Sequence, residues 1–420
     1  MKMGKTISEK ILSDRSGTDA YAGQMVEAEV DFVMVNDVTG PIAFREFDEL
    51  GVNAKREKIV LIPDHYVPNK DVASAEQAKE MRDFAKRHNI KNYFEVGRSG
   101  VCHQIMMDEG FAAPGRLIVG ADSHTCTYGG LGAFSTGIGS TEAAAVFATG
   151  KLWFKVPETI KVEVTGSFGR YVGGKDLAIR IITDIGVDGA NYRTLEFSGP
   201  GIKNIPVPDR LTVANMAIEA GGKAGIFPCD SLTEKHIKGT VRGKYSAVCS
   251  DKDAKYSQIL RYDLSELEPM VAFPHLPENG RPVKGCDVRI DQAYLGSCTN
   301  GRIEDMRVAA EVIKGRKVAE GVRFIVVPAS PKVYRQMLDE GLFSIFLDAG
   351  AFISGPTCGA CLGGYMGILA DGERAVSSTN RNFIGRMGHK GSEVYLAGPA
   401  VVAASAAAGR ICTPDDLGGK

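Results

Sequence analysis

The chain has 420 residues, 44% of them hydrophobic, and its 50 basic and 51 acidic side chains give a formal net charge of -1. This length predicts a globular protein of two or three domains, and the balanced charge argues against a protein that binds nucleic acid. No apolar stretch is long enough to span a membrane, and the segment Met1–Leu12 lacks the apolar core of a signal peptide. We therefore expect a cytoplasmic protein that binds neither membranes nor nucleic acid.

Strands and helices alternate along the first part of the chain. The apolar run Lys58–Pro63 predicts a buried strand, and Asn92–Val96 predicts the next one. Between them, Ser74–His88 has the spacing of an amphipathic helix, which a capping box of Ser74 and Gln77 would begin. This order of elements is typical of a parallel sheet covered by helices.

The region from Val156 to Ser265 has more alternating residues and its own glycine turns, so we place a separate domain there. Strands and helices alternate again behind it. We predict a strand at 292–295, a helix at 304–314, a strand at 323–327, a helix that begins after Ser330 and a strand at 351–354. The sequence therefore predicts an α/β fold with mainly parallel sheets and three domains, 1–155, 156–270 and 271–420.

Polar motifs directly follow four of the predicted strands. They are Asp64-His65, Asp122-Ser123-His124, the segment around Cys298 and the segment around Cys358. In open α/β sheets, ligands bind beyond the carboxyl ends of the strands. We therefore expect these four motifs to lie at one site.

Three of the nine cysteines form the strongest chemical signal in the chain. Cys298 lies in Gly-Ser-Cys-Thr-Asn, while Cys358 and Cys361 form a C-x-x-C pair. Zinc normally takes a fourth protein ligand, and a redox pair usually opens a helix early in a small domain, so both alternatives fit less well. Three thiolates can instead hold an iron–sulfur cube and leave one iron free as a Lewis acid.

Several polar residues are candidates for acid–base catalysis. Asp64 beside His65 suits a general acid oriented by a carboxylate, although neighbouring side chains on an extended segment point to opposite sides. Asp122 and His124 are two residues apart and would point the same way. His103 alone is more typical of a buried structural histidine, and Glu196 on a strand would face solvent.

The loop Ser377–Arg386 is rich in hydroxyl and amide side chains and contains Arg381 and Arg386. Because arginine pairs with carboxylates through two parallel hydrogen bonds, this loop suits a di- or tricarboxylate substrate. The alternative is a solvated basic loop, which is the commoner role of two nearby arginines.

Three segments of the chain resemble signature segments of the aconitase family. They are Gly296–Arg302, Gly355–Gly363 and Ser378–Arg386. Pro63–His65 and Gly120–Thr125 are similar to earlier segments of the family, in the same order, and the resemblance extends over nearly the whole chain. Within the family, the chain most resembles the separate large subunits of the branch that acts on isopropylmalate or homoaconitate.

This resemblance implies a hydro-lyase with an aconitase-like fold of three α/β domains around a [4Fe–4S] cluster. Cys298, Cys358 and Cys361 would hold the cluster, and one iron would have no protein ligand. The implied reaction is isomerisation of isopropylmalate by dehydration and rehydration in leucine biosynthesis. Homocitrate and methylmalate or citraconate are alternative substrates, and RNA binding by the cluster-free chain is a distant one.

The resemblance also implies roles for individual residues. Asp64 and His65 would protonate the departing hydroxyl, and Asp122 and His124 would surround the same oxygen. The residues implied to support this group or to bind the hydroxy-di- or tricarboxylate substrate are His103, Glu196, Asn36, Asn380, Arg381 and Arg386. The serine base of fused relatives lies on a swivel domain that we do not find here, so we expect a small subunit to supply it in a heterodimer or heterotetramer.

Overall fold

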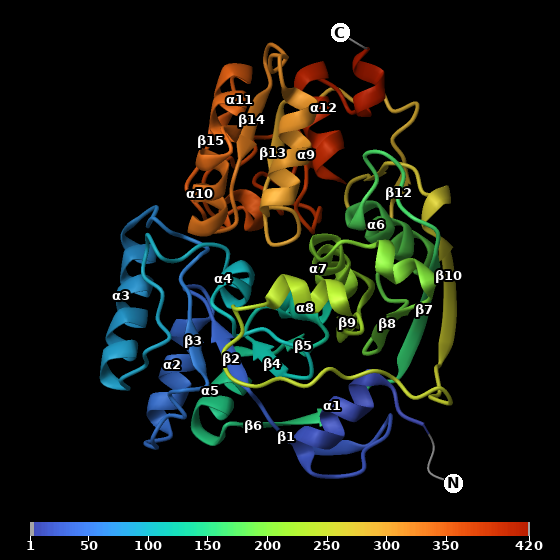
Figure 1. Cartoon of the computed structure of the whole chain (residues 1–420). Helices are drawn as coiled ribbons and strands as arrows, with labels where there is room; N and C mark the ends of the chain where they lie inside the picture. Colours follow the sequence, from blue (N-terminus) through green and yellow to red (C-terminus); the bar gives the residue numbers. More distant parts are fainter. Residues whose placement is uncertain (1–3, 419–420) are drawn as a thin grey trace.

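The computed structural model describes residues 4–418, in which three sheets and their helices surround a common centre (Figure 1). The first sheet is wholly parallel, with the strand order β3-β2-β4-β5. Its strands are β2 (Phe32–Val35), β3 (Ile59–Leu61), β4 (Leu117–Gly120) and β5 (Phe134–Gly137). The helices of this part are α2 (Gly40–Glu49), α3 (Val72–Arg87), α4 (Cys102–Asp108), the 3-10 helix η1 (Ser123–Leu131) and α5 (Ser140–Thr149). Helix α1 (Ile7–Ser16) and the antiparallel pair β1 (Met25–Glu29) and β6 (Lys151–Lys155) lie beneath it in Figure 1.

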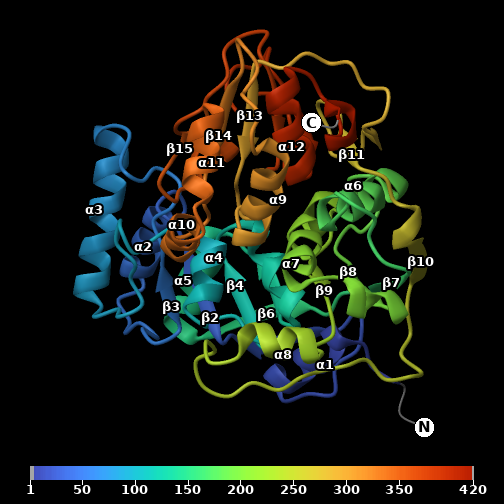
Figure 2. The ribbon, with the colours of Figure 1, turned by 45° about the horizontal axis from the view of Figure 1, so that its top comes forward.

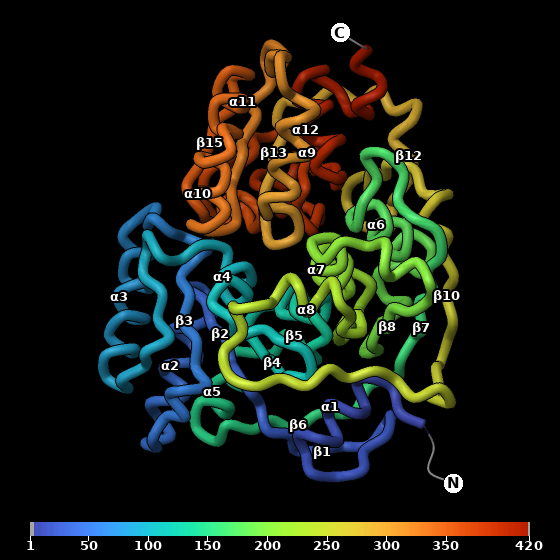
Figure 3. The backbone as a smooth tube through the Cα atoms, in the orientation of Figure 1, coloured from blue at the N-terminus to red at the C-terminus, as the bar shows by residue number. Residues whose placement is uncertain are grey.

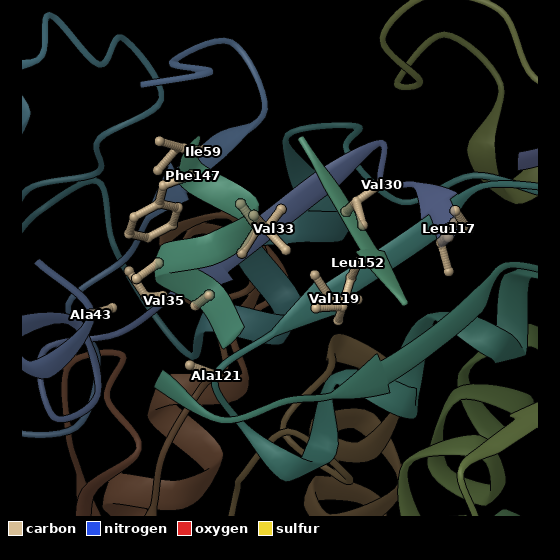
Figure 4. Close-up of a cluster of buried hydrophobic side chains, with 14 of the residues drawn as sticks. Val30, Val33, Val35, Ala43, Ile59, Leu117, Val119, Ala121, Phe147 and Leu152 are labelled. Carbon is tan, nitrogen blue, oxygen red and sulfur yellow. The ribbon is translucent and has the colours of Figure 1, made fainter. Parts of the chain in front are cut away.

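Strands β2 and β4 are buried on both faces because they are continuous apolar runs. Val33 and Val35 point to one face, where they pack with Phe147 of α5 (Figure 4). Met34 and Ile118 point to the other face, into a cluster with residues of α4 and η1. Because helices cover both faces, polar side chains that act on a ligand can appear only where these strands end.

The second sheet is also parallel, with the order β10-β7-β8-β9. Its strands are β7 (Thr159–Thr165), β8 (Thr194–Ser198), β9 (Ala224–Ile226) and β10 (Gln258–Asp263). Its helices are α6 (Gly174–Ile185), η2 (Pro200–Asn204), α7 (Val207–Asn215), η3 (Met216–Ala220), α8 (Ser231–Ile237) and η4 (Leu264–Glu266). Between α8 and β10, residues 238–257 form a long irregular strap along the lower side of the molecule (Figure 3).

The third sheet has seven strands in the order β12-β11-β17-β16-β13-β14-β15. Its strands are β11 (Met270–Ala272), β12 (Gly280–Pro282), β13 (Gln292–Leu295), β14 (Arg323–Val326), β15 (Phe352–Ile353), β16 (Arg374–Ser377) and β17 (Glu393–Ala397). The five strands from β17 to β15 pair in parallel. Strand β11 pairs antiparallel with both β17 and β12. Its helices are α9 (Ile303–Ile313), α10 (Pro331–Asp339), α11 (Leu342–Ala349), η5 (Gly359–Leu362), α12 (Pro399–Ala408) and η6 (Pro414–Leu417). Helix α7 lies near the middle of the molecule, where it contacts η1 and α6 (Figure 2).

The predicted α/β class with mainly parallel sheets is confirmed. The elements predicted for the third sheet agree with the structure to within two residues, including Ser330 as the N-cap of α10. No helix within residues 4–418 is both long and apolar enough to cross a membrane.

Helix α3 begins two residues earlier than the sequence predicted. Its N-cap is Asp71, whose carboxylate accepts a hydrogen bond from the Ser74 N–H at 2.8 Å, while the Ser74 hydroxyl accepts one from the Asp71 N–H at 3.1 Å. The predicted capping box of Ser74 and Gln77 is therefore wrong. A carboxylate three residues before a serine forms the same reciprocal pair of hydrogen bonds.

The predicted strand Asn92–Val96 forms only one bridge with β3, between Leu61 and Tyr93. Pairing stops there because the backbone turns at Glu95, whose carbonyl accepts from the Arg98 N–H at 2.8 Å. This segment is therefore a short parallel extension of the first sheet rather than a strand.

The domain boundaries at residues 155 and 270 stay a prediction, because hydrophobic clusters continue across them. Ala224 and Ile226 of β9 pack in the cluster of the first sheet. Tyr294 and Ile325 of the third sheet pack in the cluster of the second. The three sheets thus share parts of their cores, and the site lies where they meet.

Candidate active site

The loops after β13 and β15 bring the three predicted cysteines together. Ser297 has a φ of 87°, which turns the chain sharply behind β13 and leads into Cys298. Cys358 precedes η5 and Cys361 lies within it, and all three cysteines are buried. The Ser297 hydroxyl lies 3.7 Å from Cys298 Sγ and 3.6 Å from Cys361 Sγ, so one side chain contacts both loops. A hydrogen bond from Cys358 holds the pKa of Cys361 well below its usual range, whereas burial raises the pKa of Cys298 to about 12.

The surroundings of these sulfurs fit an iron–sulfur cluster better than a single zinc ion. Ligands of one tetrahedral zinc, each about 2.3 Å from the metal, lie within about 4 Å of one another. Among residues 4–418, only Asp64, His65 and Cys358 form a group of three ligand atoms all within 4.8 Å, so the three cysteine sulfurs do not all lie that close to one another. The amides of Asn215 and Asn380 each donate to Cys298 Sγ at 3.2 Å, and such donors stabilise ligand sulfur in clusters.

The motifs at the ends of the first and third sheets meet directly. The Cys358 N–H donates to the Asp64 carbonyl at 2.8 Å, and the Thr357 hydroxyl donates to the same carbonyl at 3.0 Å. The cysteine pair and the Asp64-His65 motif therefore lie side by side, as the positions beyond strand ends predicted.

His65 is held by two carboxylates. Asp64 Oδ1 lies 2.5 Å from His65 Nδ1. Asp37, which the sequence analysis did not single out, accepts from the backbone N–H groups of Asp64 and His65 at 2.9 Å and from that of Tyr66 at 2.8 Å. This bend lets the two neighbouring side chains meet, so the expectation that they point to opposite sides is wrong.

The charge of His65 follows from these neighbours. Burial alone would lower the pKa of His65, but the negative charges of Asp64, Asp37 and Asp122 outweigh it and raise that pKa to about 10. The imidazole therefore carries a proton at neutral pH. This is the state that a general acid requires.

Asp122, at the end of β4, joins the other two predicted histidines. Its Oδ1 lies 3.0 Å from His103 Nε2 and accepts from the His124 backbone N–H at 2.8 Å. Ser123 begins η1, with Asp122 as the N-cap, so His124 lies in the helix and the expected extended segment is not formed. Burial raises the pKa of Asp122, but His103 and His124 outweigh this and hold it well below its usual range. Asp122 is therefore an anion between two imidazoles.

Glu219 of η3, which the sequence analysis missed, completes this cluster. Its Oε1 lies 2.8 Å from His124 Nε2 and accepts from Arg381 Nε at 2.8 Å. The glutamate therefore links a histidine of the first sheet to the arginine loop of the third. No local signal in the sequence marks Glu219, because it lies in a short 3-10 helix away from the strand ends.

The other predicted residues also lie here. Asn36 Nδ2 is 3.5 Å from Asp122 Oδ2, and the Asn36 side-chain oxygen accepts from the backbone of its own loop. Asn380 lies between the sulfurs of Cys298 and Cys361. Arg386 has a buried Nε that forms no hydrogen bond within the described chain. Burial alone would lower the pKa of Arg386, but the nearby cysteine thiolates outweigh this effect and raise the pKa above its ordinary value. The guanidinium therefore stays charged.

Glu196 lies elsewhere. It is buried on β8 rather than facing solvent, and its Oε1 accepts from Ser250 Oγ at 2.5 Å and from the Tyr256 hydroxyl at 2.9 Å. Its Oε2 accepts from the Ile7 N–H at 2.9 Å. These partners belong to the strap 238–257 and to the start of α1. The structure therefore does not bring Glu196 to the other candidate residues, because its carboxylate fastens two peripheral segments.

Comparison with known proteins agrees with this geometry. The model of the aconitase family (aconitate hydratase) matches residues 9–409. The chain belongs to the aconitase family. Three relatives, each named 3-isopropylmalate dehydratase large subunit, come from Acetivibrio thermocellus, Thermodesulfovibrio yellowstonii and Moorella thermoacetica. Each is 55% identical to this chain, over 99% of its length and 100% of the relative's.

A solved structure supports the fold. The crystal structure of Thermococcus kodakaraensis aconitase X in its holo-form matches with a TM-score of 0.52 at 13% identity, over 90% of this chain and 89% of that one. The predictions of an aconitase-like fold and of an aconitase-family hydro-lyase are confirmed. Membership of the aconitase family implies an iron–sulfur cluster, in agreement with the surroundings of the three cysteines.

Proposed function

We propose that this chain is the large subunit of a 3-isopropylmalate dehydratase, which interconverts 2- and 3-isopropylmalate by dehydration and rehydration in leucine biosynthesis. The observation that carries the chemistry is the pair of Asp64 and His65, whose Oδ1 and Nδ1 lie 2.5 Å apart, beside the loop of Cys358 and joined to it through the Asp64 carbonyl. The identity of 55% to relatives of that name, over the whole of both chains, supports the substrate.

We assign a [4Fe–4S] cluster to Cys298, Cys358 and Cys361, with one iron that has no protein ligand. When bound, such a cluster supplies a Lewis acid that polarises a substrate hydroxyl. The assignment is supported by the three sulfurs, which do not all lie within 4.8 Å of one another, and by the two amides that donate to Cys298.

The side chains around the cysteines supply the proton chemistry. His65 donates its proton to the departing hydroxyl oxygen and recovers a proton during rehydration, while Asp64 orients the ring through Nδ1. Asp122 holds His103 by accepting from its ring, and Glu219 fixes His124 from the other side. We assign these four side chains to the positioning of the reacting oxygen.

Two arginines provide positive charge for the carboxylates of isopropylmalate. Arg381 donates through Nε to Glu219, which fixes the direction of its guanidinium, and its side chain is 20% exposed. Arg386 keeps a buried N–H without a partner in the described chain. We assign both arginines, together with Asn36 and Asn380, to substrate binding.

The relatives are named large subunits, and we infer that this chain also acts with a small one, in a heterodimer or heterotetramer. We assign to that partner a swivel domain with the base that removes the carbon-bound proton, since His65 is an acid at neutral pH. All nine cysteines are free thiols, which agrees with a place in the reducing cytoplasm.

A substrate panel tests this proposal. The chain is expressed with its small subunit, reconstituted anaerobically with iron and sulfide, and assayed on isopropylmalate, cis-homoaconitate and citraconate. We expect the highest kcat/KM with isopropylmalate. A higher value with one of the other acids would contradict the substrate assignment, and full turnover by the large chain alone would contradict the assignment of the base.

A further inference from the structure

Lys175 is a buried lysine that contacts the loop after β16, and this loop contacts the cysteines. It lies in the first turn of α6, is 1% exposed, and is the only buried lysine among residues 4–418. Its Nζ donates to the Ser378 carbonyl at 2.9 Å and to the Thr379 carbonyl at 2.7 Å. None of the roles assigned above involves this side chain.

Its position is unfavourable for a positive charge in two respects. Burial removes the ammonium group from water, and the first turn of a helix has a positive partial charge. Two carbonyls alone do not call for a charged donor, since a neutral amide satisfies them as well. Burial lowers the pKa of Lys175 to about 7, and negative charge at Cys298, Asp305 and Cys361 opposes this. Cysteines that ligate a metal are thiolates, so a bound cluster favours the charged form of Lys175.

The loop that Lys175 holds carries groups of the candidate active site. The Ser378 carbonyl also accepts from the Thr299 hydroxyl at 2.7 Å, next to Cys298 in the chain. Two residues further on, Asn380 donates to Cys298 Sγ, and Arg381 follows with its bond to Glu219. A shift of this loop would therefore move both an amide on a cluster sulfur and a guanidinium assigned to the substrate.

We propose that Lys175 is a positioning residue that fixes the loop Ser378–Arg381 and supplies a positive charge that stabilises an anionic cluster on the three cysteine thiolates. The second part of this proposal rests on the proposed function. The first part concerns the loop and holds for the cluster-free chain.

Amide hydrogen exchange in the cluster-free chain tests the tether. Lys175→Met removes both hydrogen bonds, and we expect the amides of Ser378–Arg381 to exchange about tenfold faster, because the loop opens locally more often. Lys175→Gln keeps neutral donors and should stay closer to the wild-type rates. Unchanged exchange in Lys175→Met would overturn the tether, and Lys175→Ala, which also removes both hydrogen bonds, gives the same test if the methionine variant does not fold.

The reduction potential of the reconstituted cluster tests the charge. We expect Lys175→Met and Lys175→Gln both to shift it to more negative values, because loss of a nearby positive charge disfavours reduction. The control is Thr212→Val, since the Thr212 hydroxyl is a neutral tether to the Thr299 carbonyl at 2.7 Å, and we expect no shift there. Unshifted potentials in both lysine variants, or an equal shift in the control, would overturn the charge role. If the wild-type chain takes up no cluster, the proposed function fails and the charge role with it, while the exchange rates still decide the tether.

Discussion

Two buried glutamates, Glu219 and Glu196, show how differently this molecule uses the same side chain. Both are at most 4% exposed. Glu219 contacts the imidazole of His124 and the guanidinium of Arg381, two side chains that come from different sheets. Glu196 contacts only neutral donors, in the strap 238–257 and at the start of α1.

The difference teaches that burial of a carboxylate does not by itself mark a reaction centre. A carboxylate that joins ionisable groups from separate elements fixes their charges and directions, which catalysis needs. A carboxylate that accepts only from hydroxyl and backbone N–H groups fastens segments to the core. We therefore expect changes in the region of Glu219 to alter chemistry and changes in the region of Glu196 to alter stability.

The largest effect should come from Cys298→Ser. Loss of one of three thiolate ligands should abolish cluster uptake, measured as iron and sulfide per chain after anaerobic reconstitution. The matched control is Cys286→Ser, because Cys286 is half-buried and its thiol donates to the Pro282 carbonyl at 3.7 Å. Unchanged iron content in Cys298→Ser would contradict the assignment of Cys298 as a cluster ligand.

His65→Asn should retain the cluster and lower kcat about 10²- to 10⁴-fold, because it removes the proposed general acid. His88→Asn is the control, since His88 pairs with Asp48 on the surface at 3.0 Å. The assay is turnover of isopropylmalate by the reconstituted complex. A normal kcat in His65→Asn would show that another group donates the proton.

The charge of His65 gives a smaller, pH-dependent effect. Its folded pKa of about 10 lies above the ordinary value of 6.5, so its contribution to stability is complete below pH 6.5 and is lost as the pH rises towards 10. Asp37→Asn removes one of the carboxylates that raise this pKa, so the loss should still begin near pH 6.5 but should end at a lower pH and be smaller in total. Thermal unfolding of the cluster-free chain across this pH range measures the loss of stability. Identical pH profiles for wild type and variant would contradict the role of Asp37.

The smallest effect on chemistry should come from Glu196→Gln. Replacing a buried carboxylate that accepts three hydrogen bonds should lower the free energy of unfolding by about 1 to 3 kcal/mol. Cluster content and kcat of the folded enzyme should stay unchanged. Urea unfolding and turnover measured on the same preparation test this, and a lost kcat at full cluster content would place Glu196 back in the site.

Much of the fold could be predicted from the sequence. Apolar runs such as Ala293–Leu295 become buried parallel strands, and a capping serine such as Ser330 marks the start of a helix. The misses were local: Asn92–Val96 looks like a strand, but a turn at Glu95 prevents its pairing. Such a turn depends on backbone hydrogen bonds that residue patterns do not record.

The candidate site was predictable where side chains follow strand ends, as Asp64, His65 and Asp122 do. The positions of the strand ends did not tell which of the two glutamates, Glu196 or Glu219, belongs to the site. Glu196 has the clearer strand context, while Glu219 lies in a short helix and reaches His124 only because three sheets pack together. Long-range contacts of this kind follow from tertiary packing rather than from local sequence.

The most direct test of the comparison is kcat of Glu219→Gln against that of Glu196→Gln, each in the reconstituted complex and divided by its cluster content. Loss of a charged hydrogen-bond partner of His124 and Arg381 should lower kcat about 10- to 100-fold in the first variant. The second variant should match the wild type. Equal losses in the two variants, or a larger loss in Glu196→Gln, would contradict the account.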